Sequence, residues 1–157
     1  MSAESVRKWL AANAPDLPII EVKGTTATVA TAADALGVQP GRIAKTLAVS
    51  AGDHSFLLVT RGDSRLDNRK CKDEFGSRPR MLGPDETFEL TGHPVGGVCP
   101  FGLKVPLSIY LDLSLQAFDV VYPAGGSLNT SVEIATERLF ELVGERWVDL
   151  CRAPAAG

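Results

Sequence analysis

The feature that most constrains the fold of this chain is the segment at residues 92–102, GHPVGGVCPFG. Four glycines and two prolines in eleven residues exclude a regular helix or a central strand there. The residues between them are mainly apolar, so we expect this loop to pack against the fold. Because Gly96 and Gly97 lack side chains, backbone N–H groups could approach a ligand closely. A tight structural connection would need the same residues, and that interpretation stays open.

Length and composition indicate one globular domain over residues 1–157. The chain is 45% hydrophobic and 22% charged, with a formal net charge of −3. This composition is ordinary for a globular protein, and the negative charge does not favour DNA binding. No apolar run reaches the roughly 18 residues of a membrane span, and early charged residues argue against a signal peptide. We therefore expect a cytoplasmic protein that does not enter a membrane.

The cysteines and histidines argue against a metal centre. Cys71, Cys99 and Cys151 are odd in number, far apart and without a C-x-x-C pair. This pattern fits free thiols in a reducing compartment. With His54 and His93 as the two histidines, we expect no metal site and no cofactor.

Short apolar segments separated by turn residues predict an α+β fold with a mixed, largely antiparallel sheet and flanking short helices. We expect helices at residues 6–13, 31–37, 67–75, 84–90 and 136–143. The helix at 31–37 would begin with a capping box at Thr31, and Thr136 would cap the last helix. We expect strands at residues 43–50, 55–60, 108–111, 120–122, 130–134 and 146–151, with a frayed tail at 153–157.

Lys45 stands out within the strand predicted at residues 43–50. Alternate residues of a strand share a face, so Lys45 would point the same way as Ile43, Leu47 and Val49. Burying an unpaired ammonium group is costly. The site would therefore either hold an anion or let the lysine stem extend to the surface.

A basic stretch runs over residues 61–80. It holds seven basic and four acidic residues, a local net charge of +3 within a chain of −3. Concentrated positive charge suits contacts with phosphate groups. A solvated helix with charge pairs would have the same composition, so this alternative stays open.

Cys99 and His93 could form a nucleophile and a base. No helix start or flanking cation is evident that would activate the thiol, and a small buried cysteine is the common case. The G-x-S-x-G, Walker A and H-E-x-x-H motifs are absent from the sequence. The hydrolase classes that use those motifs therefore lack support.

Four motifs, taken in order, resemble the YbaK/ProX family, freestanding relatives of the editing domain inserted in bacterial prolyl-tRNA synthetases. GRIAKTL at residues 41–47 resembles the I-x-K-T-L strand of that family, and RLDNRK at 65–70 resembles its R-L-D-N-K-K helix start. The loop at 92–102 is similar to T-G-x-x-x-G-G-V-x-P-x-G, and DVVYPAGG at 119–126 to the late strand and glycine turn. The resemblance covers residues 31–143 and implies a partial barrel.

The resemblance implies hydrolysis of the ester that joins a wrong amino acid to the 3′-terminal adenosine of a tRNA, without a metal or a covalent intermediate. It implies that Lys45 holds the 3′ CCA end, and that backbone N–H groups of the loop, at Gly96 and Gly97, position the ester and the attacking water. Further substrate contacts are expected at Thr46, Val98, Pro100, Gly125, Gly126 and Asn129. Contacts with the tRNA backbone are expected at Arg61, Arg65, Arg69 and Lys70. The partners would be aminoacyl-tRNA and an aminoacyl-tRNA synthetase assisted in trans.

One position departs from the family pattern. Several relatives carry a histidine just after the late glycine turn, where this chain has Asn129. An asparagine can hydrogen-bond a substrate but cannot act as a base. A non-catalytic module that binds a tRNA end or a nucleotide and regulates a synthetase is the alternative function, and a cysteine hydrolase using Cys99 is a third. Alanine, serine, threonine and cysteine are all small enough to be the amino acid removed.

Overall fold

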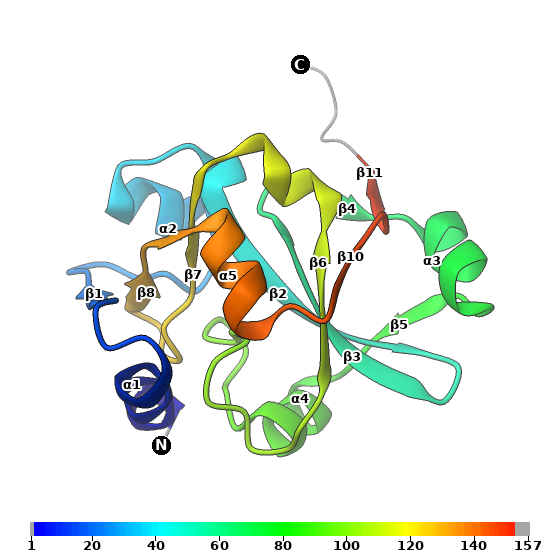
Figure 1. Ribbon diagram of the computed structural model, residues 1–157, viewed down its shortest axis with the longest axis horizontal. Helices are drawn as coiled ribbons and strands as arrows, with labels where there is room; N and C mark the ends of the chain where they lie inside the picture. Colours follow the sequence, from blue (N-terminus) through cyan, green and yellow to red (C-terminus); the bar gives the residue numbers. More distant parts are fainter. Residues whose placement is uncertain (1, 153–157) are drawn as a thin grey trace.

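The computed structural model describes residues 2–152 and centres on a seven-stranded mixed sheet with α-helices packed around it (Figure 1). The helices are α1 Ser2–Asn13, α2 Val29–Leu36, α3 Asn68–Phe75, α4 Pro84–Thr91 and α5 Thr136–Val143. The strands are β1 Ile19–Glu21, β2 Ile43–Ala51, β3 His54–Arg61, β4 Arg65–Leu66, β5 Pro79–Met81, β6 Ser108–Asp112, β7 Val120–Pro123, β8 Thr130–Val132, β9 Ile134–Ala135, β10 Arg146–Val148 and β11 Cys151–Arg152. Two 3₁₀ turns lie at Pro40–Arg42 and Leu113–Ala117.

The main sheet has the strand order β10-β6-β3-β2-β7-β9, and β5 also pairs with β2. The β10–β6, β6–β3 and β2–β7 pairs are parallel, whereas the other pairs of this sheet are antiparallel. Two small antiparallel sheets, β1–β8 and β4–β11, complete the strands of the described chain. The predicted α+β class with a mixed, largely antiparallel sheet in a partial barrel is confirmed, since five of the eight strand pairs among residues 2–152 are antiparallel.

The hairpin predicted at residues 43–60 is confirmed and forms the two central strands of the sheet. β2 and β3 pair from Ala44 opposite Arg61 to Ala51 opposite His54, around a two-residue turn. Gly52 adopts a φ of 63° in this turn, a conformation that glycine adopts readily. The alternation of apolar residues and the turn chemistry were sufficient to predict this element.

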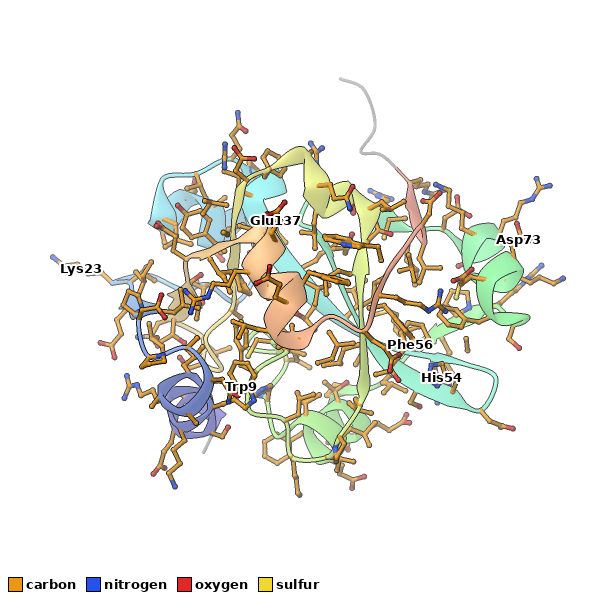
Figure 2. The ribbon with its side chains drawn as sticks, viewed as in Figure 1. Trp9, Lys23, His54, Phe56, Asp73 and Glu137 are labelled. Atoms are coloured by element: carbon orange, nitrogen blue, oxygen red, sulfur yellow. The ribbon has the colours of Figure 1, made fainter. Side chains whose placement is uncertain are left out.

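Alternate residues of the hairpin face two different cores. Ala44 and Ala48 of β2 face a core that also contains α1, α5 and the glycine-rich loop. Val49 of β2 faces the other core, under α3, as does Phe56 of β3. Phe56 stacks on Phe75 of α3 with 4.8 Å between ring centroids, next to His54 (Figure 2). The sheet is therefore covered on both faces.

The helices predicted at 6–13, 67–75 and 84–90 are confirmed, but two helix caps differ from the prediction. The cap of helix α2 lies three residues earlier than predicted, because Thr28 in an extended conformation forms the capping box and Thr31 is the third helical residue. Thr136 does not cap α5. Its hydroxyl donates to the Phe118 carbonyl at 2.6 Å instead.

The predicted strands at 130–134 and 146–151 were wrong as single elements. Each is two short strands that pair in different sheets: β8 with β1 and β9 with β7, then β10 with β6 and β11 with β4. The chain crosses between sheets within each segment, and at the second crossing the Leu150 N–H donates to the buried Asp112 carboxylate at 2.8 Å. A strand pattern does not reveal the pairing partner, which is also why β1, β4 and β5 were missed.

The glycine-rich loop is clamped between α1 and the sheet. Cys99 and Phe101 are fully buried, and the Phe101 ring lies 5.4 Å from the Trp9 ring of α1. Gly102 has a φ of 61°, and a side chain there would collide with the backbone of Ser5. The expectation that this loop packs against the fold is confirmed.

No helix within residues 2–152 has the length and apolar composition needed to cross a membrane. The expected frayed tail at 153–157 lies outside the described residues.

Candidate functional site

The candidate site lies where one edge of β2 is left open. β7 pairs with this edge at Ile43 and Ala44, and β5 pairs with it at residues 49–51. In the described chain no strand pairs with this edge between those two contacts. A cavity of about 260 Å³ opens there, between β2, the start of α2, the β5–α4 segment and the glycine-rich loop.

The open edge directs backbone groups of Thr46 toward the cavity. In an antiparallel pair, successive residues point their N–H and C=O groups alternately toward and away from the partner strand. The Ala48 carbonyl accepts from Leu82 N at 3.0 Å, so Ala48 points away from β3. Thr46 lies two residues earlier and has the same orientation. Its N–H and C=O therefore face the gap between β5 and β7.

The two faces of β2 give the cavity two different walls. Ala44 and Ala48 belong to the main core together with Leu82 and Ala124, and Thr46 shares their face, so this wall is lined by small and apolar groups. Lys45 projects from the opposite face of the strand. The cavity thus has a neutral inner wall and a wall that carries one cation.

Lys45 is held by a backbone carbonyl rather than by a carboxylate. Its Nζ donates to the Ser64 carbonyl oxygen at 2.6 Å. Burial lowers the pKa of the Lys45 ammonium group below its usual value, although the negative charge of the nearby Asp63 carboxylate acts in the opposite direction. Leu47 and Val49 on the same face pack in the second core. The ammonium group is therefore partly desolvated and available to an anion.

The loop that holds Lys45 is itself fixed by hydrogen bonds. The Ser64 hydroxyl donates to the Arg61 carbonyl at 2.8 Å and lies 2.9 Å from Thr60 Oγ1. Thr60 Oγ1 also lies 3.0 Å from Ser114 Oγ and 3.3 Å from Cys151 Sγ. This buried polar network fixes the Ser64 carbonyl, and with it the position of the lysine head group.

The glycine-rich loop contributes a tight turn to the cavity wall. Gly97 N donates to the Pro94 carbonyl at 2.9 Å, and Gly96 has a φ of 91°. The Gly97 N–H is thus used within the turn, which does not fit its expected role as a donor to a ligand. Gly96 and Val98 both line the cavity. The N–H groups of these two residues have no hydrogen-bond acceptor within residues 2–152.

Gly97 supports the site by packing instead. A methyl group on Gly97 would lie 3.1–3.2 Å from backbone atoms of Gly126 and Ser127. Gly126 has a φ of 93°, and a side chain on Gly125 would collide with Thr130. The two glycine turns therefore lie directly against each other, and this packing places Gly96 and Val98.

The predicted substrate contacts divide into two groups. Lys45, Thr46, Gly96 and Val98 line the cavity. The remaining ones lie behind it or outside it, namely Gly97, Pro100, Gly125, Gly126 and Asn129. The Asn129 side chain is exposed and accepts a hydrogen bond from Ser127 Oγ at 3.0 Å.

Several cavity residues were not predicted from the sequence. Thr28, Met81, Leu82, Val95 and Ser131 also line the cavity and come from separate segments of the chain. Val95 offered one signal in the sequence, because it is an apolar residue inside a glycine-rich loop. In the structure its side chain is 61% exposed. The others carry no motif, since their placement depends on which strands pair.

The predicted tRNA-contacting cations also divide. Arg61 forms a two-point ion pair with Asp63, and Lys70 donates to Asp149 at 2.9 Å and to the Cys151 carbonyl at 2.9 Å. Arg65 and Arg69 are exposed and belong to none of the ion pairs among residues 2–152. Arg65 lies opposite Arg152 in the β4–β11 pair. The free positive charge therefore lies along β4, β11 and the start of α3.

Cys99 and His93 meet, but not as a nucleophile and a base. Both are fully buried, and neither belongs to the cavity lining. His93 Nε2 lies 2.7 Å from the Phe101 carbonyl, which can only accept, so this nitrogen carries a proton. The same Nε2 atom lies 3.6 Å from Cys99 Sγ. Because it already carries a proton, it cannot accept the proton of the Cys99 thiol. Burial raises the pKa of the Cys99 thiol to about 12.

Metal-binding side chains do not gather in the described part of the chain. Among residues 2–152 no three His, Cys, Asp or Glu side chains are arranged so that they could hold a metal ion.

Comparison with known proteins gives consistent matches. Residues 23–142 match the family model of the aminoacyl-tRNA editing domain. The chain is 42% identical over 154 residues to the uncharacterized protein YwhH of Bacillus subtilis (strain 168), covering 97% of this chain and 98% of YwhH. It is 28% identical over 121 residues to EbsC of Enterococcus faecalis (strain ATCC 700802 / V583), which is provisionally named as a Cys-tRNA(Pro)/Cys-tRNA(Cys) deacylase; this match covers 75% of this chain and 73% of EbsC.

A solved structure matches the whole fold. It is the crystal structure of a protein provisionally described as a trans-editing enzyme for prolyl tRNA synthetase. The TM-score is 0.89 at 33% sequence identity, covering 97% of this chain and 98% of the other.

The burial of Cys99 leads to a first prediction. In the native protein at pH 7–8, we expect iodoacetamide to leave Cys99 unmodified, because the thiol is buried and protonated. In urea it should be labelled fully. Mass spectrometry of peptides after timed labelling measures both. Rapid native labelling of Cys99 would contradict the structure and would support a nucleophilic cysteine.

Proposed function

Because this chain belongs to the aminoacyl-tRNA editing domain family, we propose that it is a deacylase acting in trans on mischarged tRNA. Water adds to the carbonyl carbon of the aminoacyl ester, and the bond from that carbon to the ribose oxygen breaks. The products are a free amino acid and a tRNA with its hydroxyl group restored. The observation that carries this proposal is the cavity at the open edge of β2, where Lys45, Thr46 and the unpaired amides of Gly96 and Val98 meet.

The charge distribution of the cavity orients the substrate. The polyanionic tRNA end approaches from the side of Lys45, where Arg65, Arg69 and Arg152 provide further exposed positive charge. The amino-acid side chain enters along the neutral wall formed by Ala44, Ala48 and their neighbours. The ester then lies at the strand edge between the two walls, close to the loop.

The proposed ester hydrolysis needs few protein side chains. The amides of Gly96 and Val98 donate to the carbonyl oxygen as it gains negative charge, which is the usual action of an oxyanion hole. In the described chain no histidine, aspartate or glutamate lines the cavity. We therefore assign the proton transfers to the attacking water and the neighbouring ribose hydroxyl of the substrate. Lys45 holds the nucleotide end so that this hydroxyl is correctly placed.

The biological reason for such an activity is the weak selectivity of synthetase pockets. A pocket rejects an amino acid that is smaller by one methylene group by only about 1–3 kcal/mol. A second site that hydrolyses the wrong ester restores accuracy. A freestanding editing domain would supply this site to a synthetase in trans.

The decisive experiment uses a panel of mischarged tRNAs. The protein is incubated with each aminoacyl-tRNA, and release of the labelled amino acid is followed over the spontaneous rate. Accelerated release from at least one ester supports the proposal. Tight binding of tRNA without release from any of them would instead identify a non-catalytic binding module.

Lys45 provides a second prediction. We expect Lys45→Ala to lower single-turnover deacylation by roughly 10²-fold, the scale of removing one charged or oxyanion interaction. The free energy of unfolding should change by no more than about 1 kcal/mol, because one hydrogen bond to Ser64 is removed together with a partly buried charge. Urea unfolding monitored by circular dichroism provides the second measurement.

Lys23 provides the matched control for Lys45. It is exposed, and it lies at the end of the molecule opposite Asp73 of α3 (Figure 2). Lys23→Ala should retain wild-type deacylation. Full activity in Lys45→Ala, or equal losses in the two variants, would exclude Lys45 from the site.

The two loop glycines provide a third prediction, because substitution of Gly96 should lower turnover whereas substitution of Gly97 should lower stability. Gly96→Ala forces a side chain into a φ of 91° and toward Leu128, 2.9 Å away, and would displace an amide of the proposed oxyanion hole. We expect turnover to fall by roughly 10²–10³. Gly97→Ala instead presses on the turn at 126–127 and should mainly lower stability, by about 1–3 kcal/mol.

Gly24→Ala is the control, since no atom lies within 4 Å of a methyl group there. Unfolding free energy and single-turnover rates are measured on all three variants. Wild-type turnover in folded Gly96→Ala would show that the loop is a structural connection only.

The exposed cations near α3 provide a fourth prediction. Affinity for tRNA should fall as salt rises, because counterions are released on binding. Arg65→Glu with Arg69→Glu should weaken binding and reduce the salt slope by about one for each phosphate group that the protein no longer neutralises. Lys8→Glu on α1, an exposed cation elsewhere, is the control. An unchanged salt slope in the double variant would make this surface a solvated face.

A further inference from the structure

Three exposed apolar side chains gather at the mouth of the cavity. Among residues 2–152, Met81 is 50% exposed, Val95 61% and Leu128 47%. Met81 and Val95 line the cavity, and Leu128 Cδ2 lies 2.9 Å from the position that a Cβ atom on Gly96 would take. Single exposed apolar residues are common on protein surfaces, whereas a group of them around a cavity marks a binding surface. We call these three side chains the collar.

The cavity is too small for the whole end of an aminoacyl-tRNA. Its volume is about 260 Å³, below the roughly 300–1,000 Å³ of pockets that enclose a complete small ligand. The proposed function places the amino acid and its ester inside the cavity. The terminal base is attached to the same ribose as the ester, so it lies just outside, at the mouth. The collar is the surface that it meets there.

The chemistry of the collar suits the face of a nucleobase. Valine and leucine side chains have no hydrogen-bonding groups, and a methionine sulfur is only a weak acceptor. The collar therefore does not read the polar edge of a base. A methionine sulfur does make favourable contacts with aromatic rings. Lys45, which also lines the cavity, supplies a positive charge for the phosphate group that precedes the terminal nucleoside, so base and phosphate have separate partners.

We propose that the collar binds the base of the 3′-terminal nucleotide by apolar contact with its face. The inference rests on the proposed function and adds a base-binding surface to it. Every base has such a face, so the collar requires a base without selecting a particular one. Its side chains are positioning residues, because they hold the ribose and the ester over the open edge of β2 without touching the ester.

The test compares two tRNAs that differ only in the terminal base. The mischarged tRNA that the wild type hydrolyses fastest is prepared by ligating a synthetic aminoacyl dinucleotide to a tRNA that lacks its last two nucleotides. The terminal residue is either adenosine or a ribose without a base. Single-turnover rates at rising protein concentration give the maximal rate and the half-saturating concentration. Loss of the base should raise the wild-type half-saturating concentration by roughly tenfold, the scale of one stacked base.

Substitutions in the collar supply the second half of the test. Met81→Ala combined with Val95→Ala should raise the half-saturating concentration for the normal tRNA by roughly tenfold, the scale of losing a few buried methylene groups. The maximal rate should change much less. On the tRNA without the terminal base, the same double variant should match the wild type, because the collar has lost its partner. Leu113→Ala is the control, since Leu113 is 44% exposed and does not line the cavity.

The outcomes separate this inference from the proposed function. If the wild type hydrolyses no mischarged tRNA, the proposed function fails and the inference fails with it. If the wild type is active but the double variant has the wild-type half-saturating concentration, the inference alone fails, and the collar is left as a surface for a protein partner. Equal losses on the two tRNAs would also overturn it, because the substitutions would then act through the fold. Thermal unfolding of each variant checks that folded protein is compared.

Discussion

The open edge of β2 is the constraint on which the rest of this structure depends. β7 and β5 both pair with the same edge, at opposite ends of the strand, and leave Thr46 between them without a backbone partner. Unpaired edges normally invite further strand pairing. Here the start of α2 and the glycine-rich loop cover the gap and enclose a cavity of about 260 Å³. The candidate site is thus an interruption of the sheet rather than a depression on its surface.

The glycine-rich loop can cover this gap because it is fixed at both ends. Phe101 is buried against Trp9 of α1, and Gly97 packs on the turn that contains Gly126. With its N–H bound to Pro94, Gly97 closes the turn in which Gly96 adopts a positive φ. The glycines at 97 and 125–126 allow backbone to contact backbone, while Gly96 and Val98 retain unpaired amides. Rigid support of this kind is what preorganised donors require.

The sequence predicted the parts of this arrangement that depend on local pattern. The β2–β3 hairpin followed from alternation and a two-residue turn, and Lys45 was notable within its own strand. What could not be predicted depends on long-range pairing. The bond between Lys70 and Asp149 joins residues 79 positions apart, so the sequence could not show that Lys70 is already neutralised. The hydrogen bond from Gly97 N–H to the Pro94 carbonyl could not be predicted for another reason. Composition identifies a loop, but it does not show which of the loop amides form hydrogen bonds within it.

Lys45 and Thr46 show how one strand can present two different environments at a cavity. Adjacent residues of β2 point to opposite faces, so the half-buried ammonium group and the Thr46 hydroxyl lie on different walls although they are neighbours in sequence. The cation depends on the Ser64 carbonyl and the hydrogen bonds behind it. The Thr46 hydroxyl shares the face of Ala44 and Ala48, which belong to the main core. On the proposed function, exchange of the small residues would change the wall assigned to the amino acid without moving Lys45, whereas a change near Ser64 would move the cation itself. In such an arrangement, one face of the strand can vary while the other keeps its cation in place.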